Sequence, residues 1–302
     1  MSPESPAVPR RPDFFIVGAA KSATTSMYEY LRQHPQIFMP DRPEMSYFGQ
    51  DLSIANRIAD LDTYLAHFSP ALPDQRIGEK SVIYLFSETA AREIRDFNPN
   101  SQIVIILRNP VEMMFSLHKQ SLFSANEDIV DFETALSAEE ERRNGRRIPS
   151  AAHNPGFLLY RSVVRYSSQV ERYFEAFGRE RVQVLIFEEF TASPASFYAQ
   201  TIEFLGLETS TMSSFEIHNP RKRIPNVRLR SFMKTHPQVS KAINRVVPGR
   251  LIDASRDVLS TTQRQPLERM DPSLRIKLTR EFLPEIRAIE ETLGRDLSVW
   301  SN

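Results

Sequence analysis

The 302-residue chain contains no cysteine, which excludes disulfide bonds, thiol catalysis and cysteine-ligated metal sites. No apolar run approaches the roughly 20 residues that a membrane-spanning helix needs. Residues 1–12 are rich in proline and serine and lack an apolar core, so they do not predict a secretory signal. From these absences we expect a cytoplasmic protein with no integral membrane segment.

The chain also has no excess of charge of either sign. It has 38 Lys and Arg residues against 38 Asp and Glu residues, which disfavours a nucleic-acid partner. The six histidines show no metal-ligand spacing such as His-x-x-x-His, and we expect no metal. With 41% hydrophobic and 25% charged residues, the composition is that of a globular protein. We expect a disordered tail at residues 1–12 and a single domain at residues 13–302.

Short apolar runs alternate with segments of helical periodicity. The runs predict buried strands at residues 14–17, 103–107 and 182–187. Helices are predicted at residues 24–33, 111–121, 163–177, 197–205 and 274–293. The alternation favours βαβ units, and therefore an α/β fold with a parallel sheet between two layers of helices. Ligands of such sheets bind beyond the carboxyl ends of the strands.

Three further segments carry narrower expectations. The charge-dense stretch 127–147 is expected to include a surface helix, and the basic residues 220–230 are expected to form an irregular segment. Pro284 lies inside the last predicted helix and should kink or break it, because proline lacks an N–H and clashes with the preceding turn.

The loop after the first strand consists of small and polar residues. Its members are Gly18, Ala19, Ala20, Lys21, Ser22, Ala23, Thr24, Thr25 and Ser26. Small residues let the backbone approach a ligand closely, and the N-terminus of the following helix favours a phosphate. The alternative is a tight turn that ends in a Ser or Thr helix cap. The triphosphate-binding motif Gly-x-x-x-x-Gly-Lys-Ser/Thr does not fit, because Ala23 and Thr24 occupy its second Gly and its Lys.

This loop resembles the 5′-phosphosulfate loop of sulfotransferases that use 3′-phosphoadenosine-5′-phosphosulfate (PAPS), in particular the bacterial branch related to the heparan sulfate sulfotransferases. That branch commonly has Gly-x-x-Lys-x-Gly-Thr-Thr, and the chain departs from it at Ala23. If this position needs a positive φ, alanine is strained there. The resemblance implies a P-loop-like three-layer fold, PAPS as co-substrate and adenosine 3′,5′-bisphosphate as product.

The end of the second predicted strand offers a candidate 3′-phosphate site. Arg108 follows that strand, and Ser116 lies eight residues further on. The pair resembles the family's strand-end Arg and helix Ser, which hold the 3′-phosphate. The planar guanidinium suits bidentate phosphate contact. A surface Arg with a solvated Ser is the alternative.

The resemblance also implies a catalytic group. Glu44 lies in a segment similar to the family's Lys-Glu-x-His-x-Phe pattern, whose Glu is the general base, although Pro43 and Ser46 replace the usual Lys and His. Lys80 lies in a segment that resembles Glu-Lys/Ala-Ser-Pro, where a Lys can neutralise the transferring group, and Val82 replaces the Pro. Lys21 would stabilise the leaving phosphate. If Glu44 is not the base, His118 is the next candidate.

Two further segments resemble the family less closely. Arg221 and Lys222 belong to a basic segment resembling one that closes over the nucleotide in the family; a solvated loop is the alternative. The ending around Trp300 resembles that of bacterial members, where it packs.

The leading hypothesis is a sulfotransferase acting on a hydroxyl or amine of a carbohydrate, a glycolipid or a small natural product. A nucleotide-dependent kinase on a similar scaffold and a non-catalytic nucleotide-binding module are the alternatives. The sequence does not predict an oligomeric state.

Overall fold

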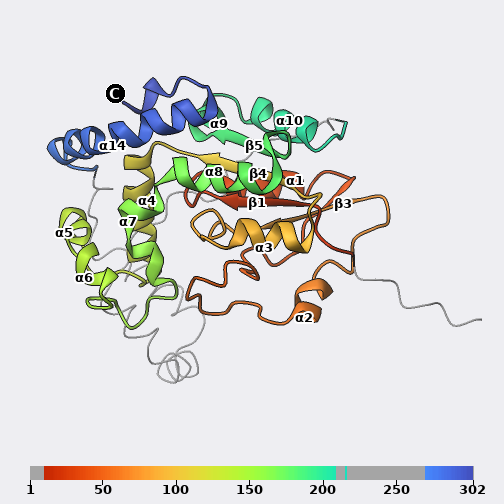
Figure 1. Ribbon diagram of the computed structural model, residues 1–302, viewed down its shortest axis with the longest axis horizontal. Coiled ribbons are helices and arrows are strands. Elements are labelled where there is room, and N and C mark those ends of the chain that lie inside the picture. Colours follow the sequence, from red (N-terminus) through yellow and green to blue (C-terminus); the bar gives the residue numbers. More distant parts are fainter. Residues whose placement is uncertain (1–9, 209–214, 216–268, 302) are drawn as a thin grey trace, which may run out of the picture. The chain divides into compact units, whose positions relative to one another are not determined.

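The computed structural model describes residues 10–208, 215 and 269–301 (Figure 1). The predicted basic segment 220–230, with Arg221 and Lys222, lies outside these residues. The chain divides into two compact units. The first comprises residues 1–109, 165–219 and 287–296, and the second comprises 110–164, 220–286 and 297–302.

The first unit is built on a five-stranded sheet in the order β2-β3-β1-β4-β5. All of its strand pairings are parallel. The strands are β1 (Phe14–Gly18), β2 (Ile37–Phe38), β3 (Arg76–Lys80), β4 (Gln102–Leu107) and β5 (Val182–Ile186). Parallel pairing brings the carboxyl ends of β3, β1 and β4 to one edge of the sheet.

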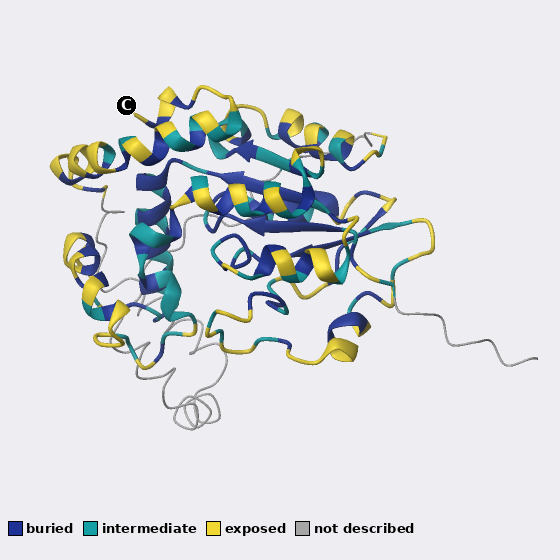
Figure 2. Cartoon of the chain, in the orientation of Figure 1, coloured by how far each residue is buried: buried dark blue, intermediate teal, exposed yellow. Residues whose placement is uncertain are grey.

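Helices cover both faces of this sheet, which makes three layers. On one face, Ile16 and Val104 share a buried cluster with residues of α1 (Thr24–Leu31), α9 (Phe187–Ala192) and α10 (Pro194–Phe204). On the other, the ring of Phe15 contacts Phe48, which contacts Phe97 of α3 (Ala90–Phe97). Helix α8 (Tyr166–Phe177) packs against α3, β4 and β5, and a short helix α2 spans Leu61–Ala66. Figure 2 shows the strands as the buried centre of this arrangement.

The three predicted strands are confirmed to within one residue at each end. The prediction missed β2 and β3. Strand β3 has the sequence Arg-Ile-Gly-Glu-Lys, so it lacks an apolar run although four of its five residues are buried. It forms because its polar side chains find partners in the protein; the buried carboxylate of Glu79, for example, accepts a hydrogen bond from the hydroxyl of Tyr64 at 2.7 Å.

Three residues of the expected tail, 10–12, make contacts in the first unit. Arg10 donates to the carbonyl of Gln75 (2.7 Å) and Arg11 to that of Phe97 (2.8 Å). Pro12 is buried, and its carbonyl accepts a hydrogen bond from Asn98 (3.0 Å). The rest of the expected tail lies outside the described residues.

The second unit is helical in its described part. It contains α4 (Pro110–Phe123), α5 (Phe132–Ser137), α6 (Glu139–Arg143), α7 (Tyr160–Val163) and the first part of α14 (Pro272–Leu293). The expected helix 163–177 is divided into α7 and α8, and it ends at Gly178 as predicted. Helix α14 continues through Pro284 without a break, and Phe282 and Ile286 on either side of the proline are buried. Trp300 is fully buried.

The charge-dense stretch includes two short helices, α5 and α6, which both carry exposed residues, but part of its charge is buried. Arg142 donates to Glu127 at 2.7 Å, and their side chains are 1% and 0% exposed. Tyr160 donates to the other oxygen of Glu127 (2.8 Å). Burial raises the pKa of Glu127, but the Arg142 hydrogen bond and other donors outweigh it, so the net direction is downward.

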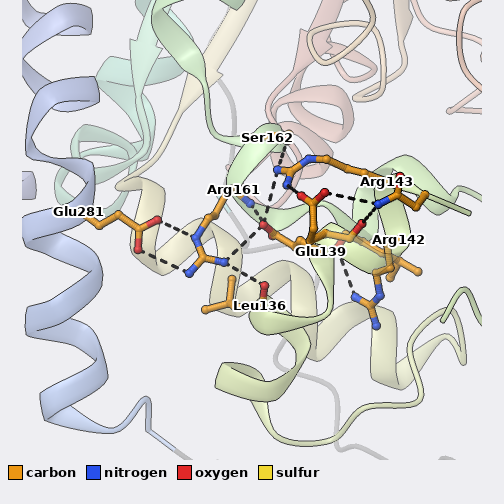
Figure 3. Close-up of polar contacts among 10 residues, drawn as sticks. Leu136, Glu139, Arg142, Arg143, Arg161, Ser162 and Glu281 are labelled. Carbon is orange, nitrogen blue, oxygen red and sulfur yellow. Dashed lines mark hydrogen bonds and ion pairs between the residues drawn. The ribbon is translucent and has the colours of Figure 1, made fainter. Parts of the chain in front are cut away.

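A second charged group of this unit surrounds Arg161 (Figure 3). Its Nε donates to Glu281 at 2.6 Å, and its Nη1 donates to the carbonyl of Leu136 at 3.0 Å. Its backbone N–H donates to Glu139 at 2.9 Å. Because Glu281 belongs to α14, Arg161 connects that helix with α5 and α6.

Among the described residues, no helix is long and apolar enough to cross a membrane.

Candidate active site

The loop between β1 and α1 is shaped by close packing at its first residue. A Cβ added to Gly18 would stand 2.6 Å from Cβ of Leu85, so only glycine fits without a shift. The N–H of Ala19 then donates to the carbonyl of Ile106 in β4 (2.7 Å). Lys21 and Ala23 both have φ 61°. Position 23, where the resembled family has Gly, therefore has a backbone in the left-handed region. An alanine with such a positive φ is strained, as we expected for this case.

Helix α1 starts without a capping side chain. Ala23 occupies the N-cap, makes no side-chain cap hydrogen bond, and is followed by no acidic residue in the first turn. The alternative of a Ser or Thr cap is therefore wrong. Ser22, Thr24 and Ser26 are buried, whereas Lys21 and Thr25 are half-buried. An eight-residue helix whose N-terminus has neither a cap nor a negative charge suits an anion.

Arg108 lies beside this loop. It follows β4, which pairs with β1, and its Nη1 donates to the carbonyl of Lys21 at 3.1 Å. The guanidinium also lies 4.6 Å from the centroid of the Phe187 ring, a cation–π contact that orients it. Ser116 is a half-buried residue of α4 in the second unit. Its joint action with Arg108 stays a prediction.

The structure brings Glu44 and Lys80 together. Lys80 ends β3, opposite Ile16 of β1, and its ammonium forms an ion pair with Glu44. The backbone N–H of Glu44 also donates to the carbonyl of Lys80 (2.8 Å). The Lys80 side chain is 5% exposed and that of Glu44 is 38% exposed, so the carboxylate can be reached from solvent while the ammonium is largely enclosed.

The departure from the family pattern at Val82 has a direct consequence. The Val82 N–H donates to Oε2 of Glu44 at 2.9 Å, whereas a proline at this position would have no N–H to give. Both carboxylate oxygens of Glu44 are therefore held, one by Lys80 and one by this backbone group.

Sequence reasoning missed a second carboxylate next to this pair. Glu79 is fully buried and accepts hydrogen bonds from the hydroxyls of Tyr64 (2.7 Å), Ser81 (2.7 Å) and Tyr84 (2.8 Å). Burial raises the pKa of Glu79 to about 7, against the opposing effect of these hydrogen bonds. The available signal was a charged pair, Glu79-Lys80, in a segment that resembles an acceptor-cleft motif.

His118, the reserve candidate for the base, belongs to the second unit. It is 2% exposed, and its Nε2 lies 2.9 Å from the carbonyl oxygen of Ile129. Its ring packs against Phe132 and Tyr160. Burial lowers the pKa of His118. These contacts indicate a packed side chain with one ring nitrogen already engaged.

These features define the class of protein: a parallel α/β domain with an anion-suited loop after its first strand and a carboxylate–lysine pair at the neighbouring strand. The family model described as sulfotransferase domain matches residues 11–244. A solved sulfotransferase structure from Alicyclobacillus acidocaldarius is 30% identical, with a TM-score of 0.72 over 97% of this chain and 100% of that chain. The chain belongs to the sulfotransferase family, and the expected P-loop-like three-layer fold is confirmed.

Curated relatives include proteins of heparan sulfate modification. The bifunctional heparan sulfate N-deacetylase/N-sulfotransferase 1 of Caenorhabditis briggsae is 24% identical over 65% of this chain and 23% of its own length. The heparan sulfate glucosamine 3-O-sulfotransferase 6 of Mus musculus is 24% identical over 78% of this chain and 67% of its own length. The chain thus spans about a quarter of the first of these relatives. Family membership favours the sulfotransferase hypothesis over the kinase alternative.

Proposed function

We propose that the protein transfers the sulfuryl group of PAPS to a hydroxyl or amine of an acceptor and releases adenosine 3′,5′-bisphosphate. One observation carries this proposal. The carboxyl ends of β3, β1 and β4 lie side by side, so the loop 18–26, the Glu44–Lys80 pair and Arg108 share one edge of the sheet. Membership of the sulfotransferase family supports the same conclusion.

The donor would be held by its phosphates. We assign the 5′-phosphosulfate to the backbone and hydroxyl groups of loop 18–26 together with Lys21, because the uncapped helix N-terminus there favours an anion. We assign the 3′-phosphate to Arg108 and Ser116. Arg221 and Lys222 are proposed to close over the nucleotide, a role that rests on the resemblance alone.

The transfer would be direct and in line. Glu44 takes the acceptor proton as the acceptor atom forms its bond to sulfur, and the bond between sulfur and the 5′-phosphate oxygen breaks. The electron pair of that bond goes to the departing phosphate, whose charge Lys21 stabilises. Lys80, which pairs with Glu44 in this structure, would neutralise the sulfuryl oxygens in transit. This route needs neither a covalent enzyme intermediate nor a metal.

The names of the curated relatives favour a carbohydrate acceptor. A glycolipid and a hydroxylated small natural product are the other candidate acceptors. A panel of such compounds with radiolabelled PAPS would identify the acceptor, and EDTA should leave the measured transfer unchanged.

Two substitutions separate binding from chemistry. Arg108→Ala should weaken the binding of adenosine 3′,5′-bisphosphate by about 2–5 kcal/mol if the charge pair is desolvated. The binding of adenosine 5′-phosphate should barely change. Glu44→Gln keeps the size of the side chain but cannot take a proton, so single-turnover transfer should fall by ~10²–10⁴-fold at nearly unchanged nucleotide affinity. Lys21→Ala should lower both the rate of single-turnover transfer and the nucleotide affinity. Equal affinity of the wild type for the two nucleotides, measured by calorimetry, would refute the proposal.

A further inference from the structure

Residues 44–48, here called the base loop, adopt a backbone that their own sequence does not favour. Glu44 has φ 59° and Ser46 has φ 53°, both in the left-handed region. Such conformations are unfavourable for a non-glycine residue and persist only where surrounding groups hold them. The base loop therefore needs anchors outside itself.

Two of these anchors are hydroxyl groups that lie between the base loop and Glu79. The Ser46 N–H donates to Oγ of Ser81 at 3.1 Å, and that hydroxyl donates to Oε1 of Glu79 at 2.7 Å. The Phe48 N–H lies 3.4 Å from the hydroxyl oxygen of Tyr84, which donates to the same Oε1 at 2.8 Å. Each hydroxyl thus accepts from the loop and donates to the carboxylate.

A third contact connects Tyr47, the residue between Ser46 and Phe48, to Glu79. The ring of Tyr47 stacks on that of Tyr64, with centroids 4.3 Å apart and planes at 13°. The Tyr64 hydroxyl donates to Oε2 of Glu79 at 2.7 Å. Residues 46, 47 and 48 are therefore all connected to one buried carboxylate through one intervening group each.

The direction of these hydrogen bonds explains why a side chain with an acceptor oxygen stands at this position. Oε1 of Glu79 accepts from both Ser81 and Tyr84, so each of these hydroxyls points its proton toward Glu79. The lone pairs of Ser81 and Tyr84 are then turned toward the base-loop amides. Ser81, Tyr84 and Tyr64 are each 0% exposed, so no solvent competes for them.

We propose that Glu79 is the positioning residue for the base of the reaction: through Ser81, Tyr84 and Tyr64 it holds residues 46–48, and thereby the strained backbone that presents Glu44 beside Lys80. This inference rests on the proposed function for its catalytic meaning. Its structural content, the anchoring of the base loop by Glu79, can be tested without an acceptor.

The test is amide hydrogen exchange at single-residue resolution on the full chain. Ser81→Ala should speed exchange of the Ser46 amide by about 2- to 13-fold, the equivalent of one hydrogen bond, and leave the Phe48 amide unchanged. Tyr84→Phe should speed exchange of the Phe48 amide and leave the Ser46 amide unchanged. Glu79→Leu, which removes the acceptor at similar volume, should speed exchange at both amides.

Glu79→Gln is the matched control. Its carbonyl oxygen can take the place of Oε1, which accepts both hydroxyls, while its amide faces Tyr64, so both base-loop amides should stay protected. Protection in Glu79→Leu equal to that of the wild type would overturn the inference, as would single-hydroxyl variants that leave their own amide unchanged. If Glu79→Leu does not fold, Ser81→Ala and Tyr84→Phe still test the two hydroxyl links between the base loop and Glu79, and an unchanged amide in either variant overturns the inference.

Activity supplies the second readout. Single-turnover transfer should fall by up to about 100-fold in Glu79→Leu, the scale of a misplaced catalytic group, at unchanged affinity for adenosine 3′,5′-bisphosphate. A wild type that binds no such nucleotide would defeat the proposed function and leave the exchange result standing. A normal turnover in Glu79→Leu with loosened amides would defeat the positioning role alone.

Discussion

The buried carboxylate of Glu79 should make stability depend on pH in the opposite sense to most acidic groups. Its pKa rises from 4.5 to about 7 on folding because burial disfavours the ionised form. The folded protein therefore holds this proton more tightly than the unfolded chain. The stabilisation is fully present below pH 4.5 and is lost as the pH rises toward 7.

The magnitude follows from the size of that change. At about 1.4 kcal/mol per pH unit, the rise from 4.5 to about 7 corresponds to about 3 kcal/mol. The full value applies because the side chain is 0% exposed. Its nearest titratable neighbours, Tyr64 and Tyr84, stay neutral in this range, since burial raises the pKa of both well above the ordinary 10.0. Glu44, the nearby acid, also raises the pKa of Glu79.

The assay compares urea unfolding of the wild type and Glu79→Gln between pH 4.5 and 8. Because glutamine does not titrate, the free energy of unfolding of the variant should gain about 3 kcal/mol on that of the wild type across this range. Glu88→Gln, which removes an exposed carboxyl group, provides the baseline. Parallel curves for the wild type and Glu79→Gln would refute the reasoning, because they would mean that Glu79 binds its proton equally in both states.

Three further substitutions test other parts of the structure. Ala23→Gly removes the strain of an alanine with a positive φ. It should raise the free energy of unfolding by about 0.5–1 kcal/mol, after the entropy that the added glycine gives the unfolded chain is subtracted. A lower free energy of unfolding, measured with urea, would contradict the strain. Arg142→Ala leaves Glu127 buried without its cation and should cost about 3–5 kcal/mol of stability, and a cost below 1 kcal/mol would count against a buried ion pair. Val82→Pro removes the N–H that holds Glu44 and should lower turnover about tenfold, whereas Val82→Ala keeps that donor and should not; equal rates would show that this bond has no catalytic weight.

Local signals in the sequence were enough for the elements that are apolar or punctuated. The runs at residues 14–17 and 103–107 predict buried strands because a sheet covered on both faces leaves few polar positions. Gly18 and Arg108 at their ends then mark the edge where a ligand would bind, and the structure places both there. Gly178 ends α8 as predicted, with φ 79°.

Tertiary structure alone decided the rest. Strand β3 is polar, and only its burial beside β1, with Arg76 bonded to Asp13, makes it a strand. Because β3 was missed, the sequence could not show that Lys80 meets Glu44, 36 residues away, or that Glu79 accepts three hydroxyls. Contacts of this kind depend on which strands become neighbours, and that is set by packing over the whole sheet rather than by local propensity. The sequence thus determined the family and the loop that suits an anion, whereas the fold decided which charged groups share one edge of the sheet.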